Sequence, residues 1–235
     1  MSLILFALTA FLPKGYDILG HGEFIEEEKL QDVDSKEQIL LSLMTSVLDR
    51  WHYQPQDIND TFSQKVFDTY LKYIDGSKRF LLKEEVEQLE DFKFHLDDQI
   101  EDGNLEFFNL SKDLITKSRS RARKITEDIL SSPMNLQDEE YVEMDGDKRD
   151  YLETEEDLKD FWRRWLEHEV LQRYYTRVKK QEKRAENEEE FTPKPLDSLQ
   201  IEAHEKVKEV FGKWFDRMDQ RDDMDFYSTY LNVIA

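Results

Sequence analysis

Residues 62–80 of this chain read FSQKVFDTYLKYIDGSKRF, and this stretch decides the fold. Its apolar residues recur at the spacing that places side chains on one face of an α-helix: Phe62, Val66, Phe67, Tyr70, Leu71 and Ile74. Asp75 and Gly76 interrupt the pattern, and an apolar run resumes at Phe80. The connection is too short for any return other than an antiparallel one, so a helix over 86–100 is expected to pack against the first. The stretch therefore predicts a helical hairpin.

The composition extends this helical prediction to the whole chain. Only seven of its 235 residues are Gly and five are Pro, while 38% are hydrophobic and 12% aromatic. Such a chain has few tight turns and enough apolar surface for a real core. The sequence contains no alternating strand pattern and no internal repeat. The predicted fold class is all-α, an irregular multi-helix bundle with antiparallel helical hairpins.

The net charge limits the classes of partner. A formal charge of −21 repels nucleic acids and anionic membrane surfaces, so neither is expected as a partner. The chain has no Cys, which excludes disulfides and thiolate chemistry. A chain without Cys is compatible with an oxidising periplasm and with the cytosol, so this absence does not fix the compartment.

Residues 1–30 are predicted to be a signal-like or irregular N-terminal segment. Leu3 to Leu12 reads LILFALTAFL, which is as long as the apolar centre of a signal peptide and too short for a stable membrane span. No Lys or Arg precedes this run, and no clear Ala-x-Ala cleavage site follows it before Pro13. The alternative is an N-terminal hydrophobic arm that packs on the domain.

Two larger parts are expected after this segment. Residues 31–191 are predicted to form a helical domain with an acidic loop at 138–160, and residues 192–235 a C-terminal helical pair. The acidic loop has twelve acidic residues against three basic ones, which favours a solvated loop. Thr154 is expected to cap the helix that follows, because the next three residues are carboxylates. The sequence TPKP at 192–195 is the clearest linker.

A basic run lies in the helix predicted over 105–129. It consists of Lys117, Arg119, Arg121, Arg123 and Lys124. Alternate spacing scatters these charges around a helix instead of aligning them. A solvated face paired with neighbouring acids is therefore favoured over an anion site.

The side chains that catalysis or metal binding requires do not fall into a known pattern. The five histidines are His21, His52, His95, His168 and His204, and none has the spacing that places two ligands on one helix face. Residues 145–147 with Asp150 lack the pattern of a calcium loop, although a loose divalent-cation site in the acidic loop is a minor alternative. No Ser lies in a Gly-x-Ser-x-Gly turn. We predict no catalytic residue, no metal and no cofactor site.

The sequence on both sides of residues 62–80 resembles that of a known family. TSVLDRWHYQ at 45–54 precedes it, FLLKEEVEQLEDF at 80–92 and LDDQIEDGNLEFF at 96–108 follow it, and LKDFWRRWLEHEVL at 158–171 is a looser likeness. This order of aromatic residues, Asp and Gly resembles the N-terminal helical region of bacterial tail-specific (carboxy-terminal processing) periplasmic serine proteases. The resemblance implies an exported, periplasmic protein with a downstream PDZ domain and a protease core with a Ser/Lys dyad.

The resemblance implies a function but supplies no site. In that family this region is a non-catalytic N-terminal helical module that flanks the protease core and contributes to substrate enclosure and to adaptor or partner binding. Its implied partners are its own downstream PDZ and protease domains, protein substrates and an adaptor protein. No residue here matches the Ser/Lys dyad, so the chain is predicted to be inactive alone. The alternative is a free-standing acidic helical protein–protein interaction module.

The last helix supplies the only candidate contact residues. Over 226–234 it carries more apolar surface than one side of a small bundle is expected to bury, so part of it is predicted to dock on a downstream domain and, without that domain, to lie exposed, fray or bury itself in a neighbouring copy. The alternative is a last helix that its own bundle accommodates fully. The candidate docking residues are Phe226, Tyr227, Tyr230, Leu231 and Ile234.

Overall fold

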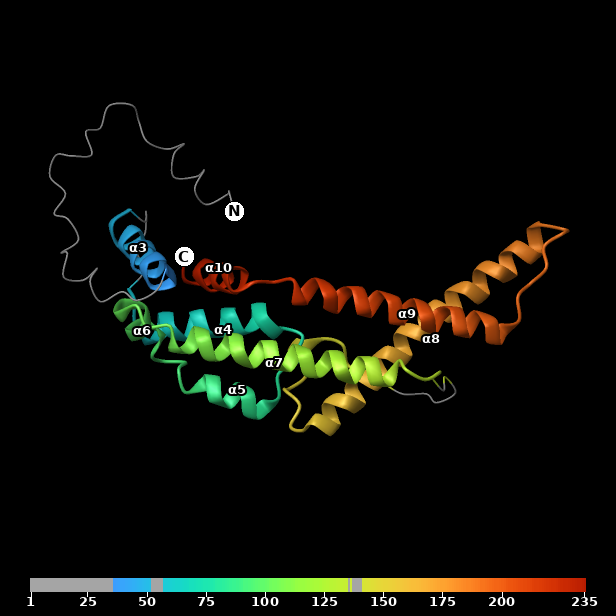
Figure 1. Cartoon of the computed structure of the whole chain (residues 1–235), viewed down its shortest axis with the longest axis horizontal. Helices are drawn as coiled ribbons and strands as arrows, with labels where there is room; N and C mark the ends of the chain where they lie inside the picture. Colours follow the sequence, from blue (N-terminus) through green and yellow to red (C-terminus); the bar gives the residue numbers. More distant parts are fainter. Residues whose placement is uncertain (1–35, 52–56, 135, 137–140) are drawn as a thin grey trace, which may run out of the picture.

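The computed structural model describes residues 36–51, 57–134, 136 and 141–235, and all its regular elements in these ranges are helical (Figure 1). The predicted all-α class is confirmed. The α-helices are α3 (Lys36–Trp51), α4 (Asp60–Asp75), α5 (Lys83–Glu90), α6 (Leu96–Asp102), α7 (Glu106–Ile129), α8 (Glu155–Asn187), α9 (Leu196–Asp219) and α10 (Asp223–Ile234), with a short 3-10 helix, η1 (Gly146–Lys148). The signal-like segment 1–30, His21 and His52 lie outside the described residues.

Helix α4 forms where the opening stretch predicts it. The side-chain oxygen of Asn59 accepts hydrogen bonds from the backbone N–H groups of Thr61 and Phe62, at 3.0 and 3.1 Å, and so caps the helix. Its buried face contains Val66, Phe67, Tyr70 and Ile74, as the apolar spacing predicts. The helix ends at Asp75, directly before Gly76.

The single helix predicted over 86–100 is wrong, because the structure divides this segment into α5 and α6. A turn over 91–95 separates them, and it allows Phe92 to pack on Phe107 with ring centres 6.0 Å apart. Helix α5 then packs against α7, while α6 packs against α4. The hydroxyl of Ser63 on α4 donates to Asp97 on α6 at 2.6 Å and accepts from the backbone N–H of the same residue at 2.7 Å. The helix of the predicted return that packs against α4 is therefore α6, its second half.

Helices α8 and α9 form a long hairpin that extends away from α3, α4 and α6 (Figure 1). The Thr154 hydroxyl accepts from the backbone N–H of Asp157, and the Asp157 carboxylate accepts from the backbone N–H of Thr154, which confirms the predicted cap. Trp162 on α8 is fully buried and lies 5.9 Å, centre to centre, from the ring of Phe215 on α9. The chain beyond Val178 has no apolar face, and residues 182–190 are exposed, as expected.

One hydrophobic core runs through the described residues from Leu41 to Ile234, on both sides of the linker at 192–195. Helix α10 returns to this core and packs against α4 and α7. Among the described helices, none is both long enough and apolar enough to cross a membrane.

Candidate functional site

The predicted docking helix, α10, is buried within the chain's own bundle. Tyr227 and Tyr230 are 0% exposed, Ile234 4% and Phe226 8%, while Leu231 is half-buried. The prediction that part of this apolar surface stays exposed is therefore wrong for these four side chains. They cannot form an exposed docking face in the arrangement that the structure shows.

Aromatic rings on two other helices explain this burial. The ring of Tyr230 lies 5.3 Å from Tyr70 of α4 and 5.6 Å from Phe108 of α7, while Tyr227 lies 5.1 Å from Phe108, measured between ring centres. The Tyr227 hydroxyl also donates to the backbone carbonyl of Glu37 on α3. The apolar face of α10 thus has partners on three helices, which one-dimensional spacing could not reveal.

The Asp75–Leu82 loop, which joins α4 to α5, is held by a network of hydrogen bonds. The Asp75 carboxylate is 2% exposed and accepts from the backbone N–H groups of Arg79 at 3.0 Å, Phe80 at 3.0 Å and Leu81 at 2.9 Å. Burial raises the pKa of Asp75 to about 6, although the three backbone donors favour its charged form. This carboxylate holds the reversal of the chain after α4.

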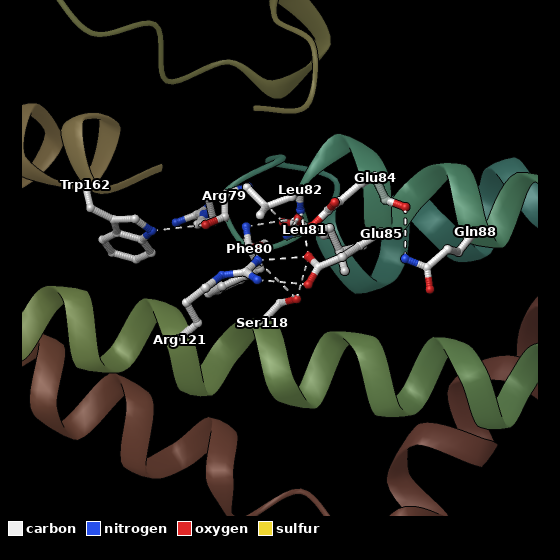
Figure 2. Close-up of polar contacts among 11 residues, drawn as sticks. Arg79, Phe80, Leu81, Leu82, Glu84, Glu85, Gln88, Ser118, Arg121 and Trp162 are labelled. Carbon is white, nitrogen blue, oxygen red and sulfur yellow. Dashed lines mark hydrogen bonds and ion pairs between the residues drawn. The ribbon is translucent and has the colours of Figure 1, made fainter. Parts of the chain in front are cut away.

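A buried ion pair fixes the far end of the same loop to α7 (Figure 2). The guanidinium of Arg121 donates to both carboxylate oxygens of Glu85, at 2.9 and 2.8 Å, and to the carbonyl of Phe80 at 2.9 Å. Ser118 and the backbone N–H of Leu82 donate to the second Glu85 oxygen, at 3.0 and 2.8 Å. Burial opposes ionisation of Glu85, but these donors, with Arg121 first, hold its pKa below the ordinary value.

Arg79 connects the loop to the α8–α9 hairpin. Its guanidinium carbon lies 4.6 Å from the ring centre of Trp165 and 5.7 Å from that of Trp214, within the range of cation–π attraction. Its backbone carbonyl accepts from the indole N–H of Trp162 at 3.1 Å (Figure 2). The Asp75–Leu82 loop therefore connects α4 to α5 and contacts three further helices: α7, α8 and α9.

The end of the acidic segment packs on this loop, which corrects the prediction of a solvated loop over all of 138–160. Arg149 donates to the carbonyls of Ser77 and Lys78, and its guanidinium carbon lies 3.8 Å from the ring centre of Phe161. The backbone N–H of Lys83 donates to the carbonyl of Leu152 at 2.9 Å. Gly146 is buried so closely that a Cβ there would lie 2.2 Å from the backbone carbonyl oxygen of Gly76. Residues 138–140 lie outside the described residues.

The basic run on α7 is also partly buried, so the prediction of a solvated face is wrong for two of its members. Arg119 is 8% exposed, and Arg121 forms the ion pair with Glu85. Arg123 does follow the prediction, because it pairs at the surface with Asp216 at 2.8 Å and with Asp219. Alternate spacing scatters the charges as expected, but it turns some of them toward the core.

The buried serine hydroxyls of the described chain have structural partners. Ser63 bonds to Asp97, Ser118 to Glu85, and Ser111 to the carbonyl of Phe108 at 2.8 Å. No group of three or more His, Asp or Glu side chains within the described ranges could hold a metal ion. The polar side chains of the Asp75–Leu82 loop thus join helices, and this role could not be read from residue spacing. The sequence signal for the position of the loop was the break in the helical pattern at Asp75 and Gly76.

Together these features define an all-helical domain in which buried charges hold a central loop against three long helices. The chain belongs to the family of tail-specific protease N-terminal domains, whose family model matches residues 44–235. It is similar to the tail-specific protease of Haemophilus influenzae (strain ATCC 51907 / DSM 11121 / KW20 / Rd), with 24% identity over 140 residues. The match covers 59% of this chain and 20% of that protein, so the matched part of the chain spans a fifth of the relative's length.

Proposed function

We propose that this chain is the non-catalytic helical module of a periplasmic tail-specific serine protease, where it flanks the protease core and contributes to substrate enclosure and to adaptor or partner binding. The observation that carries the proposal is the family match over 44–235, in a chain that corresponds to only part of its relative. The engagement of Ser63, Ser111 and Ser118 in structural hydrogen bonds supports a non-catalytic role. The apolar run at 3–12 supports export.

Purified chain should not cleave a substrate protein that ends in an apolar tail. The measurement is substrate loss over time on denaturing gels. Turnover that disappears when a single Ser of this chain is replaced by Ala would refute the non-catalytic role. A trace of contaminating protease is recognised because that replacement leaves its turnover unchanged.

The reading frame that follows residue 235 tests the modular part of the proposal. Continuation into a PDZ domain and a Ser/Lys protease core is the expected result. A stop codon at that position would instead support the free-standing interaction module. If the frame continues, the remainder expressed without residues 1–235 should retain the dyad but handle substrates differently, measured as the range of tailed substrates that it cleaves.

A further inference from the structure

A pocket of about 330 Å³ lies where the segment after α7, the middle of α8 and the beginning of α9 meet. Figure 1 shows the end of α7 approaching the α8–α9 hairpin in this region. The volume is at the lower end of the range for ligand sites in proteins, so it suits one or two side chains and not a folded surface. None of its lining residues belongs to the Asp75–Leu82 loop, so the pocket lies apart from that loop.

The wall of this pocket is apolar and held in place. Met134, Val170 and Ile201 line it from the segment after α7, from α8 and from α9 respectively. The side-chain amide of Gln200 donates to the carbonyl of Met134 at 3.2 Å and so fixes that segment to α9. Ile201 is 59% exposed, so its side chain is accessible to a partner. The wall therefore gives an aliphatic side chain an apolar surface to pack on, formed by three separate segments.

The polar groups around the wall have one sign of charge. Asp197 and Glu205 line the pocket, whereas none of its lining residues is Lys or Arg. The side chain of Glu205 is 64% exposed, so its carboxylate is available to a partner. The chain as a whole carries a charge of −21. Charge complementarity therefore favours a partner with basic groups next to its apolar anchor.

A buried imidazole adds a polar position to the same pocket. His204 lines it and is 7% exposed, and its Nε2 has no hydrogen-bond partner among the described residues. Its Nδ1 lies 3.6 Å from the carboxylate of Glu205, at the rim. A buried polar atom without a partner is destabilising. The imidazole therefore adds a buried polar atom with no partner in the described chain to the residues that line the pocket.

We propose that this pocket, formed by Met134, Val170, Ile201 and His204 with Asp197 and Glu205 at its rim, binds a protein segment in which an aliphatic side chain is flanked by Lys or Arg. This proposal goes beyond the proposed function, because it assigns a binding site and a ligand class that hold whether or not the chain flanks a protease. Its failure would leave the protease-module assignment untouched. Conversely, a stop codon after residue 235 would not affect it.

The test uses the whole chain and three labelled hexapeptides: Lys-Lys-Leu-Leu-Lys-Lys, Lys-Lys-Ser-Ser-Lys-Lys and Glu-Glu-Leu-Leu-Glu-Glu. Fluorescence anisotropy is measured at about 0.15 M salt, where general attraction to distant charges is screened. The basic leucine peptide should bind about tenfold more tightly than the basic serine peptide, because only it supplies apolar contact. The acidic leucine peptide should bind more weakly than the basic one, because the rim carboxylates repel it.

Matched variants locate the contact. Ile201→Asp should lower affinity for the basic leucine peptide to that of the serine peptide, although the new carboxylate attracts its charges. Tyr175→Asp is the control, because Tyr175 is 61% exposed on α8 and does not line the pocket. It adds the same charge and should leave the affinity unchanged. Ile201→Ser provides a second variant with no change of charge and should also lower affinity, and thermal unfolding checks that every variant is folded.

Three results would overturn the proposal. Equal affinity for the leucine and serine peptides would show only general charge attraction. Equal effects of Ile201→Asp and Tyr175→Asp would place binding elsewhere. Self-association in sedimentation experiments that Ile201→Asp abolishes would assign the pocket to a second copy of this chain instead.

Discussion

Replacing Arg121 with Met should destabilise the domain strongly, because it leaves a buried carboxylate without its countercharge. Glu85 is only 5% exposed and Arg121 14% exposed at the side chain. The variant removes two hydrogen bonds to Glu85 and one to the carbonyl of Phe80, while burial of the carboxylate persists. Breaking one side of a buried pair costs about 3–5 kcal/mol, and we expect the Arg121→Met loss in that range.

Urea unfolding followed by Trp fluorescence measures this loss, and Trp162 reports on the same loop through its bond to Arg79. Arg123→Met is the matched control on the same helix, because its ion pairs lie at the surface and should cost under about 1 kcal/mol. The double variant Glu85→Gln with Arg121→Met should lose less than the sum of the two single losses. A loss below about 0.5 kcal/mol for Arg121→Met, or one equal to that of Arg123→Met, would refute the buried-pair reasoning.

The same pair predicts a pH dependence with a definite sign. The pKa of Glu85 is lowered in the folded chain, so its stabilising contribution is present above the ordinary value of about 4.3 and is lost as pH falls through the lower folded value. The stability difference between the unmodified chain and Arg121→Met should therefore be full at neutral pH and should shrink in acid below about pH 4. A difference that grows on acidification would contradict the assignment.

Three further changes test other contacts. Gly146→Ala places a carbon 2.2 Å from a backbone oxygen and should lower the free energy of unfolding by about 1–3 kcal/mol through overpacking. Gly212→Ala, in a helix with open space around it, should be neutral or stabilising. Thermal unfolding compares the two variants. The pKa of Asp75 is raised to about 6 in the folded chain, so the contribution of Asp75 to stability is complete below its pKa in the unfolded chain and is lost as pH rises through 6. In urea titrations the free energy of unfolding of the unmodified chain should therefore exceed that of Asp75→Asn by less and less between pH 4 and pH 7. A constant difference would refute this. Phe67→Ala should lower the free energy of unfolding by about 3–5 kcal/mol, because Phe67 is only 1% exposed. Tyr73→Ala should change it very little, because Tyr73 is 68% exposed. Equal urea midpoints for the two variants would show that this face of α4 is not core.

The local sequence pattern was sufficient to predict a helix where a single feature, such as apolar spacing or a capping residue, determines it. The spacing of Val66, Phe67 and Tyr70 defined the buried face of α4, and Thr154 before three carboxylates defined the beginning of α8. The break between α5 and α6 was missed because Phe92 and Leu96 keep a helical spacing across it. Packing of Phe92 on Phe107 decides that break, and the contact joins residues that are distant along the chain.

The charged groups were less predictable than the apolar ones. A list of arginines on α7 does not show which of them meets a buried acceptor, since Glu85 and the carbonyl of Phe80 come from another element. Burial of Tyr227 and Tyr230 depended in the same way on rings presented by α4 and α7. The pattern of a sequence indicates which side chains need burial. Which residues bury them depends on the assembled fold.

The exposed end of α8 determines how far the α8–α9 hairpin projects. Its last residues, from Lys179 to Asn187, contact solvent on almost every side and add little to the hydrophobic core. At 1.5 Å per residue these nine residues add about 13 Å of length to the hairpin. Because these residues bury little apolar surface, shortening or extending the hairpin by whole turns should change how far it projects with little effect on the stability of the domain.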